Sequence, residues 1–451
     1  MSLNQSFTIG IRRENDHKFE ARTPLIPDHV REIKSRFPHV QFLIQPSQLR
    51  AFSDQDYLEA GATIQDDLSP ASLILCVKEV YPEQLIDNKT HLVFAHVIKG
   101  QMGNMGILQA LLQRGITLVD YECITNNQGQ RTVFFGRSAG HAGMFETLRA
   151  FGQRLEVQGQ PSIFSQLKPI YDYPQLSAAL IHLDALAVAI RDNPKLIGMA
   201  DQPVVFAIAG MGNVGQGAAE IFDRLPHTAV RPQDLATLAH AEQGGLFKCE
   251  LQKADLLRNS AGLFNAAEYD ENPFSHHSIL PELLPHISVL LNCVFYAPQF
   301  PKILPQPAFR NAWLDRPQRL QVVGDLSCDP PDGSVACSVI AGDLHHPVFD
   351  YDPITEEVVE AFGQDTVTVM AVDNLCAGLP LDASVAFSTM LLPYLEALIH
   401  TDWAAPDVSL TLPSDLQRAV VTHQNQLTEP FRYLQTPLQA SLQHQSSPAL
   451  V

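Results

Sequence analysis

The feature that most constrains the fold of this chain is a strand that runs through a glycine-rich turn directly into a helix. Residues 203–222 read P-V-V-F-A-I-A-G-M-G-N-V-G-Q-G-A-A-E-I-F, with glycines at G-x-G-x-x-G spacing. The first glycine permits the tight turn, the second lets a pyrophosphate approach the backbone, and the third allows close helix–strand packing. A merely glycine-rich turn is the alternative. The context favours a dinucleotide site, with cofactor-binding residues Gly210, Gly212, Asn213, Val214 and Gly215.

An alternation of strands and helices on both sides of this motif predicts an α/β fold. Strands are expected at 7–12, 40–45, 72–78, 91–97 and 116–121, and after the glycine turn at 228–231, 246–251, 287–294 and 320–326. This rhythm predicts parallel sheets covered by helices on both faces. A chain of 451 residues exceeds one ordinary core. We therefore expect two Rossmann-like, doubly wound parallel-sheet domains flanking a cleft.

The last hundred residues hold one more strand, T-V-T-V-M-A-V-D-N, and one more helix, A-S-V-A-F-S-T-M-L-L-P-Y-L-E-A-L-I. These elements are too few for a separate core. We therefore expect the tail to fold back onto the first domain and to make it discontinuous. The expected division is a substrate and catalytic domain of residues 1–140 with 345–451, and a dinucleotide-binding domain of residues 141–344.

Charge and cysteine usage exclude several classes of partner. With 30 basic and 49 acidic residues the formal net charge is −19, which would repel nucleic acids and acidic membranes. No apolar run near 18 residues and no signal-peptide pattern stand out, so we expect a soluble cytoplasmic protein. The expected partners are small-molecule substrates, and a homo-oligomer is compatible with the sequence. The seven cysteines are scattered without C-x-x-C or zinc-finger spacing, which predicts buried free thiols and no metal site.

Two neighbouring apolar runs lead into residues that can exchange protons. The run L-I-L-C-V is followed by Lys78, and the run L-V-F-A is followed by His96. The carboxyl ends of parallel strands are where α/β sheets bind ligands, so both residues are expected at a ligand site. Taken alone, each also has a structural interpretation: a strand-end lysine that reaches solvent, and a histidine satisfied within the fold.

A set of motifs between residues 7 and 435 is similar to those of a known enzyme family. They include I-G-I-R-R-E-N, E-A-R-T-P-L-I-P, L-V-D-Y-E, F-F-G-R-S-A-G-H-A-G-M, the glycine turn and V-D-N-L-C-A-G-L-P. On these residues the chain resembles lysine-ketoglutarate reductase, the lysine-forming saccharopine dehydrogenase, a branch of the alanine dehydrogenase and transhydrogenase superfamily. The resemblance implies an NAD(P)H-dependent condensation of lysine with 2-oxoglutarate to saccharopine.

The resemblance also implies roles for individual residues. Its acid–base pair falls on Lys78 and His96, and its substrate contacts fall on Arg22, Lys99, Glu122, Arg131 and Asp325. Saccharopine carries three carboxylates, so a pocket with several cations makes chemical sense. Clustered cations would lower the pKa of Lys78, and Glu122 would moderate that effect. The near-neutral pKa of histidine suits the several proton transfers of carbinolamine formation and collapse.

Two departures from the family pattern leave the amine substrate open. A proline pair stands in Cys328-Asp329-Pro330-Pro331-Asp332-Gly333, and Cys376 replaces the proline of D-N-L-P. One alternative is therefore an alanine-dehydrogenase-like or opine-type enzyme that uses ammonia or another amine. A non-catalytic nucleotide-binding subunit is disfavoured, because both proton-transfer positions are occupied.

The choice between the two nicotinamide dinucleotides depends on the residue that meets the adenosine ribose. An acidic residue about 20 positions after the glycine turn normally binds the 2′-hydroxyl of NAD. The strand T-A-V-R-P-Q instead ends in Arg231, and no carboxylate follows before Asp234. A guanidinium suits a 2′-phosphate, so we expect NADP, with NAD as the alternative. Arg231 and Asn292 complete the predicted cofactor-binding residues.

Overall fold

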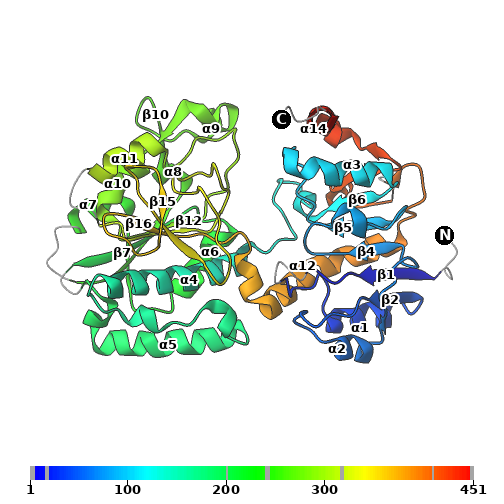
Figure 1. Cartoon of the computed structure of the whole chain (residues 1–451), viewed down its shortest axis with the longest axis horizontal. Coiled ribbons are helices and arrows are strands. Elements are labelled where there is room, and N and C mark those ends of the chain that lie inside the picture. Colours follow the sequence, from blue (N-terminus) through cyan, green and yellow to red (C-terminus); the bar gives the residue numbers. More distant parts are fainter. Residues whose placement is uncertain are drawn as a thin grey trace. The chain divides into compact units, whose positions relative to one another are not determined.

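The computed structural model describes residues 6–15, 20–199, 202–238, 244–314, 319–408 and 411–446. By its internal contacts the chain divides into two compact units, residues 1–135 with 380–451 and residues 136–379 (Figure 1). In the described part, each unit contains an eight-stranded, mixed but mostly parallel sheet. The α/β expectation is therefore confirmed.

The sheet of the first unit has the strand order β18-β17-β6-β5-β4-β1-β2-β3. Its parallel strands are β1 (Phe7–Ile11), β2 (Val40–Ile44), β3 (Thr63–Ile64), β4 (Leu73–Leu75), β5 (Thr90–Val93) and β6 (Thr117–Asp120). The C-terminal part adds β17 (Val420–His423) antiparallel to β6, followed by β18 (Gln426–Leu427). Each of the five strands expected before the glycine turn is present.

The strands of this sheet are buried on both sides, because helices cover both of its faces. One face packs against α1 (Pro27–Arg36), α2 (Asp54–Glu59) and α12 (Pro380–His400). The other face packs against α3 (Met105–Gln113). Successive strand residues alternate between the two cores, as Ile74 and Leu75 do on β4, which is the period-two pattern of a strand. The final helix of the unit is α14 (Gln435–Ser446).

The sheet of the second unit has the order β15-β14-β16-β13-β12-β7-β9-β8. Its parallel strands are β7 (Pro203–Ala209), β8 (Thr228–Val230), β9 (Gly245–Leu251), β12 (Val289–Asn292), β13 (Val322–Asp325) and β16 (Val367–Met370). Antiparallel strands β14 (Val348–Tyr351) and β15 (Val358–Val359) close one edge. A small hairpin, β10 (Leu257–Asn259) with β11 (His276–Ser278), stands apart from the sheet.

Two layers of helices cover the second sheet (Figure 1). One core contains α4 (Gly136–Val157), α5 (Leu176–Asp192) and α6 (Asn213–Phe222), and the other contains α11 (Gln306–Leu314) and the region of α9 (Ala266–Glu271). Helices α4 and α6 touch through their backbones. A Cβ atom on Gly140 would lie 2.1 Å from the carbonyl oxygen of Val214, and one on Gly217 would lie 2.3 Å from that of Arg137. Only glycine permits this approach.

The expected boundary near residue 345 is corrected by this sheet. The strand expected within T-V-T-V-M-A-V-D-N forms as β16, but it pairs with β13 and β14 of the second unit. Residues 345–379 therefore belong to the second unit, and the return to the first unit comes at Pro380. The strand was recognised from its residues, whereas its partner strands lie far away in the sequence.

Helix α12 corrects a second expectation. By length and composition it is apolar enough to cross a membrane, although no such run was noted in the sequence. Its residues Phe387, Leu391 and Leu395 are fully buried in the core of the first unit. This packing accounts for the apolar composition of the helix.

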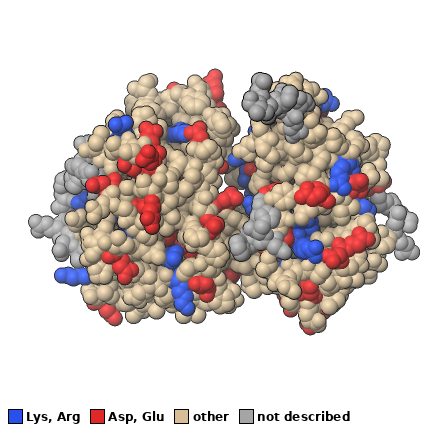
Figure 2. All heavy atoms as spheres, viewed as in Figure 1, with Lys and Arg blue, Asp and Glu red and all other residues tan. Residues whose placement is uncertain are grey.

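On the face shown in Figure 2, acidic and basic side chains are interspersed over both units.

The cysteines are free, as the sequence predicts. All seven are unpaired and either buried or partly buried. No group of three or more His, Cys, Asp or Glu side chains that could hold a metal ion occurs within the described ranges. Burial raises the pKa of thiols such as Cys76 and Cys293, so these cysteines remain protonated and act as small apolar side chains.

Candidate active site

The two predicted proton-transfer residues follow adjacent parallel strands. Strands β4 and β5 pair with Leu75 opposite Leu92. The pairing continues past the strand ends, because the N–H of Phe94 donates to the carbonyl oxygen of Val77 over 3.2 Å. Lys78 therefore lies next to Val77 on one segment, and His96 lies two residues beyond Phe94 on the other. The structure brings their backbones together at the carboxyl edge of the sheet, as predicted.

The backbone at His96 is in the left-handed region, with a φ of 54°. This conformation is uncommon for residues other than glycine, and it turns the chain out of the strand direction. The carbonyl oxygen of His96 accepts a 2.8 Å hydrogen bond from the side-chain amide of Asn104. The ring stacks on Phe94, with centroids 6.3 Å apart. The imidazole is therefore supported on one side and remains 40% exposed.

Glu79 is a neighbour of His96 that the sequence analysis did not single out. Its Oε2 lies 3.8 Å from Nε2 of His96, and its side chain is largely buried. A carboxylate at this distance stabilises the protonated form of an imidazole. The signal in the sequence was its position, directly after Lys78 at the same strand end.

Arg22 is fully buried and paired with Glu20. Its Nε donates to Oε1 of Glu20 over 2.7 Å, and both side chains are at most 2% exposed. The guanidinium also lies 4.2 Å from the ring centre of Phe135. Arg22 is thus held in one orientation by two neighbours within the first unit. The E-A-R motif contained this acidic partner two residues before the arginine.

Glu122 and Arg131, predicted separately, form an ion pair between Oε1 and Nη2. Glu122 lies on a short 3-10 turn, Tyr121–Cys123, that follows β6, and Arg131 forms an antiparallel bridge with Thr125. The Arg131 side chain is 39% exposed. Lys99 is exposed on the segment that follows His96.

Two buried carboxylates that the sequence analysis missed stand at this edge of the sheet. Glu14 follows β1, and Asp120 ends β6. Burial, with the nearby charge of Glu20, raises the pKa of Glu14 to about 7. Burial, with the nearby charge of Glu122, raises the pKa of Asp120 to about 7. Both carboxyls accept hydrogen bonds from backbone N–H groups beyond the ends of β4 and β5.

The glycine turn of the second unit fits a dinucleotide. Gly210 has a φ of 89°, which an L side chain rarely adopts, and a Cβ atom on Gly215 would lie 2.0 Å from the carbonyl oxygen of Gly210. In contrast, a Cβ on Gly212 would have nothing within 4 Å. Gly212 caps α6, so open space adjoins the first N–H groups of that helix, at Asn213 and Val214. This is the arrangement that accepts a pyrophosphate.

The premise of the Arg231 prediction is not met. Strand β8, which ends before Arg231, is the edge strand, and β9 stands between it and β7. Arg231 instead forms two hydrogen bonds with Asp234, of 2.8 and 3.1 Å, on the exposed side of the unit. The strand beside the glycine turn is β9, because the N–H of Gly210 donates to the carbonyl oxygen of Leu251 over 3.0 Å. The side chains that follow β9 take the place expected for Arg231.

Asn292 and Asp325 come together, but beneath the surface. They end the adjacent strands β12 and β13, and the Asn292 amide donates to Oδ1 of Asp325 over 2.8 Å and to Oγ of Ser334 over 2.9 Å. Both side chains are fully buried, and burial raises the pKa of Asp325. In this conformation they support the loops around Cys328, whose N–H donates to Asp325.

Comparison with known proteins finds similarity to dehydrogenases and to semialdehyde synthases. Residues 10–142 match the family model described as alanine dehydrogenase/PNT, N-terminal domain. The mitochondrial alpha-aminoadipic semialdehyde synthase of Mus musculus is 30% identical over 96% of this chain and 48% of its own length. The Arabidopsis thaliana protein of the same name is 30% identical over 94% of this chain and 41% of its length. The chain thus spans about half of the length of these curated relatives.

Further relatives match over most of both chains. The saccharopine dehydrogenase (NAD(+), L-lysine-forming) of Yarrowia lipolytica is 25% identical over 87% of this chain and 92% of its own length. Among solved structures, an L-alanine dehydrogenase aligns over 96% of this chain and all of its own, with a TM-score of 0.60 and 17% identity. A transhydrogenase from Sinorhizobium meliloti aligns over 93% of this chain and all of its own, with a TM-score of 0.51 and 12% identity. Residues 10–142 are therefore similar to the alanine dehydrogenase/PNT N-terminal domain, and nearly the whole chain is similar in sequence to part of the alpha-aminoadipic semialdehyde synthases and to saccharopine dehydrogenases.

Proposed function

We propose that this protein catalyses the NADPH-dependent condensation of L-lysine with 2-oxoglutarate to saccharopine, and its reverse. The observation that carries the proposal is the 30% identity over 96% of the chain to alpha-aminoadipic semialdehyde synthase. The match to a lysine-forming saccharopine dehydrogenase over 92% of that enzyme points to the same reaction. A nicotinamide cofactor is implied by the family.

The first unit contributes the groups that bind substrate. Saccharopine and its precursors carry several carboxylates, for which charge-assisted bonds from arginine and lysine are the usual partners. Arg22, Lys99 and Arg131 are the cations assigned to them. Arg22 is held rigidly by Glu20 and Phe135, so it presents a preoriented guanidinium. Glu122 pairs with Arg131 and limits the positive charge of the site.

Lys78 and His96 exchange protons with the reacting amine and with the oxygen that leaves as water. Condensation requires a neutral amine to attack the keto carbon and then a proton to be delivered to the departing hydroxyl. One of the two residues serves each of these tasks. Glu79, 3.8 Å from Nε2 of His96, favours the protonated imidazole when that ring acts as the acid. A nicotinamide dinucleotide, when bound, would supply the hydride that reduces the imine carbon.

NADPH is the proposed cofactor on the basis of the residues after β9. Leu251 ends the strand beside Gly210, and Gln252 and Lys253 follow it as exposed side chains. None of these three is a carboxylate that would bind the ribose 2′-hydroxyl of NAD. Lys253 supplies a cation for a 2′-phosphate, the part first assigned to Arg231.

The test is the oxidation of NADPH in the presence of 2-oxoglutarate and a panel of amines that includes lysine, ornithine and ammonia. Lysine should support the highest kcat/KM, and mass spectrometry should identify saccharopine as the product. The Lys78→Met protein serves as the matched control for background oxidation. Faster turnover with ammonia or ornithine, or no turnover with any amine, would contradict the proposal.

A further inference from the structure

We propose that Glu14 and Asp120 are positioning residues, which fix the backbone on either side of the predicted proton-transfer pair and so set where Lys78 and His96 project. This inference rests on the proposed function only through the roles of those two residues. It is drawn from the hydrogen bonds of the two carboxyls and from the order of the strands that carry them.

Glu14 holds the segment that carries Lys78. Its Oε1 accepts the N–H of Val77 over 2.7 Å, and its Oε2 accepts the N–H of Lys78 itself over 3.1 Å. These N–H groups lie just past the end of β4, where the carbonyl ladder of the neighbouring β1 has ended. Both oxygens of one carboxyl therefore replace the missing strand partner at the residue before the predicted lysine and at the lysine.

Asp120 makes the corresponding contacts on the His96 side. Its Oδ2 accepts the N–H of Ala95, the residue before His96, over 3.3 Å. Its Oδ1 accepts the N–H of Glu122 over 2.9 Å. One buried side chain thus ties the His96 segment to the turn that carries Glu122. The left-handed backbone of His96 follows directly after this contact.

The strand order explains why the contacts of Glu14 and Asp120 are alike. Within the first unit the central strands run β6-β5-β4-β1. The inner pair, β4 and β5, leads to Lys78 and His96, and the outer pair, β1 and β6, leads to Glu14 and Asp120. Each outer strand thus supplies one carboxyl to the inner strand beside it. We call these two carboxyls, Glu14 and Asp120, the braces. In the described part of the sheet, such carboxyls are found beside the two predicted proton-transfer residues and not at the other strand ends.

Burial of a carboxyl costs free energy unless its hydrogen bonds are satisfied, so the burial of Glu14 and Asp120 requires an explanation. Glu14 is 7% exposed and Asp120 is fully buried. An apolar side chain at either position would leave the N–H groups that the carboxyl now binds without an acceptor, and that segment would lose its anchor. Displacement of a reacting group by about 1 Å can cost 10²-fold in rate. An ionised carboxylate offers one acceptor oxygen to each of two N–H groups, whereas an amide has a single acceptor oxygen.

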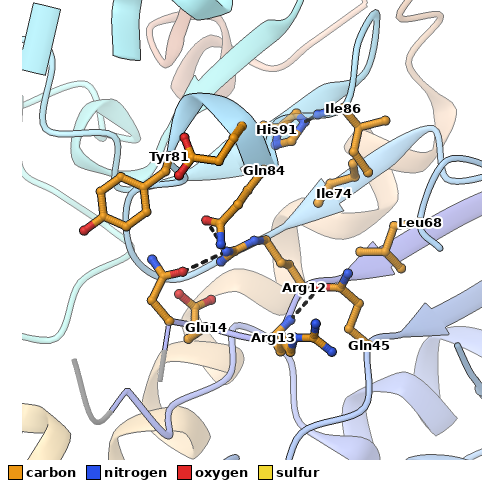
Figure 3. Close-up of a pocket in the computed structure, with 12 residues that line it drawn as sticks. Arg12, Arg13, Glu14, Gln45, Leu68, Ile74, Tyr81, Gln84, Ile86 and His91 are labelled. Carbon is orange, nitrogen blue, oxygen red and sulfur yellow. Dashed lines mark hydrogen bonds between the residues drawn. The ribbon is translucent and has the colours of Figure 1, made fainter. Parts of the chain in front are cut away.

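A cavity beside Glu14 provides a matched control. It has a volume of about 590 Å³, and Glu83 is among its lining residues. Arg12, Tyr81 and His91 also line it (Figure 3). Arg12 donates hydrogen bonds to the side chains of Asn15 and Gln84. Arg12 and Gln84 are labelled in Figure 3. Glu83 also lines the cavity but is exposed. Glu83→Gln therefore makes the same carboxyl-to-amide change near Glu14, but at an exposed position.

The experiment is a double-mutant cycle on the full chain. Glu14→Gln should lower kcat by about 10- to 100-fold with an unchanged KM for the nicotinamide cofactor, whose glycine turn lies in the other unit. Glu83→Gln should leave kcat and KM unchanged. In a Lys78→Met background, Glu14→Gln should cost about twofold or less, because a positioning residue has nothing left to position. Asp120→Asn should behave in the same way toward His96→Gln, and it replaces the first cycle if the Glu14→Gln protein does not fold.

The outcomes separate this inference from the proposed function. If Lys78→Met and His96→Gln retain full activity, the proposed mechanism fails. If those variants are impaired but the brace variants keep the wild-type kcat, the positioning inference alone is overturned. It is equally overturned if Glu14→Gln costs the same factor in the wild-type and Lys78→Met backgrounds, since that result indicates a general structural role.

Discussion

Arg154 on α4 donates a 2.8 Å hydrogen bond from Nη1 to Oδ2 of Asp350 on β14, and both side chains are at most 4% exposed. Asp350 also accepts bonds from the N–H groups of Phe362 and Gly363 and from the hydroxyl of Thr368. The carboxylate is therefore the hub that joins β14, β16 and the loop between them to the long helix of the second unit.

Asp350→Ala should destabilise the second unit by about 3–5 kcal/mol, because it leaves the Arg154 cation buried without its partner. Urea unfolding in a Trp403→Phe background isolates this unit, since Trp313 on α11 is then the one remaining tryptophan. Glu357→Ala, at an exposed site on the same connection, should change stability by about 0.5 kcal/mol or less. Equal unfolding curves for the two variants would show that the hub contributes nothing.

The same contacts of Arg154 also explain why the domain boundary was expected near residue 345. The alternation T-V-T-V-M-A identified a strand correctly, because period-two patterning is local. Its assignment to the first unit was wrong, because the choice between two sheets depends on distant partners such as Arg154, which donates to the carbonyl oxygen of Thr366 from 212 positions away. The strand ends at Lys78 and His96 were predictable for the opposite reason. Consecutive apolar runs in parallel strands bring their carboxyl ends to one edge whatever the rest of the chain does.

The proposed proton-transfer residues lead to a kinetic prediction. Lys78→Met and His96→Gln should each lower kcat by about 10²–10⁴-fold, the usual contribution of a general acid or base. Each should also remove one limb of the pH profile, while the KM for NADPH stays near the wild-type value. Lys89→Met, which changes a lysine at the amino end of β5, is the control and should remain fully active. Wild-type kcat and pH profiles in both site variants would remove these residues from the mechanism.

Arg22 and Arg131 should differ in their effects, although both are assigned to substrate carboxylates. Either replacement by alanine should weaken binding of the 2-oxo acid by about 1.5–3 kcal/mol. Arg22→Ala should in addition destabilise the fold, because Glu20 would be left buried without its partner. Arg131 is 39% exposed, so Arg131→Ala should unfold like the wild type. Unchanged KM values for lysine and 2-oxoglutarate in both variants would exclude the clamp.

The cofactor preference should depend on the residue after β9 and not on the one after β8. Lys253→Ala should raise the KM for NADPH by about 10-fold or more, as expected for a lost charged hydrogen bond, and leave that for NADH unchanged. Arg231→Ala is the matched control, since Arg231 is paired with Asp234 on the edge of the sheet. A rise in the NADPH KM for the Arg231 variant alone would restore the original assignment. The edge position of β8 could not be read from the sequence, because strand order is not encoded in local patterning.

The raised pKa of Glu14 predicts a pH dependence of stability in the first unit. The folded state binds the Glu14 proton up to a pH of about 7, whereas an unfolded glutamate releases it near 4.5. This contribution to stability is therefore fully present below pH 4.5 and is lost as the pH rises through about 7. Glu20, which raises this pKa, and Arg12, which lowers it, are the charged groups that act on it. The Glu14→Gln protein has no such group, so the wild type should lose stability relative to it as the pH rises from 4.5 to about 7. Unfolding followed by Trp403 in a Trp313→Phe background measures the difference, and the Glu83→Gln protein should run parallel to the wild type. A constant difference between the wild type and Glu14→Gln across this range would mean that Glu14 is ionised in the folded protein as readily as in the unfolded chain.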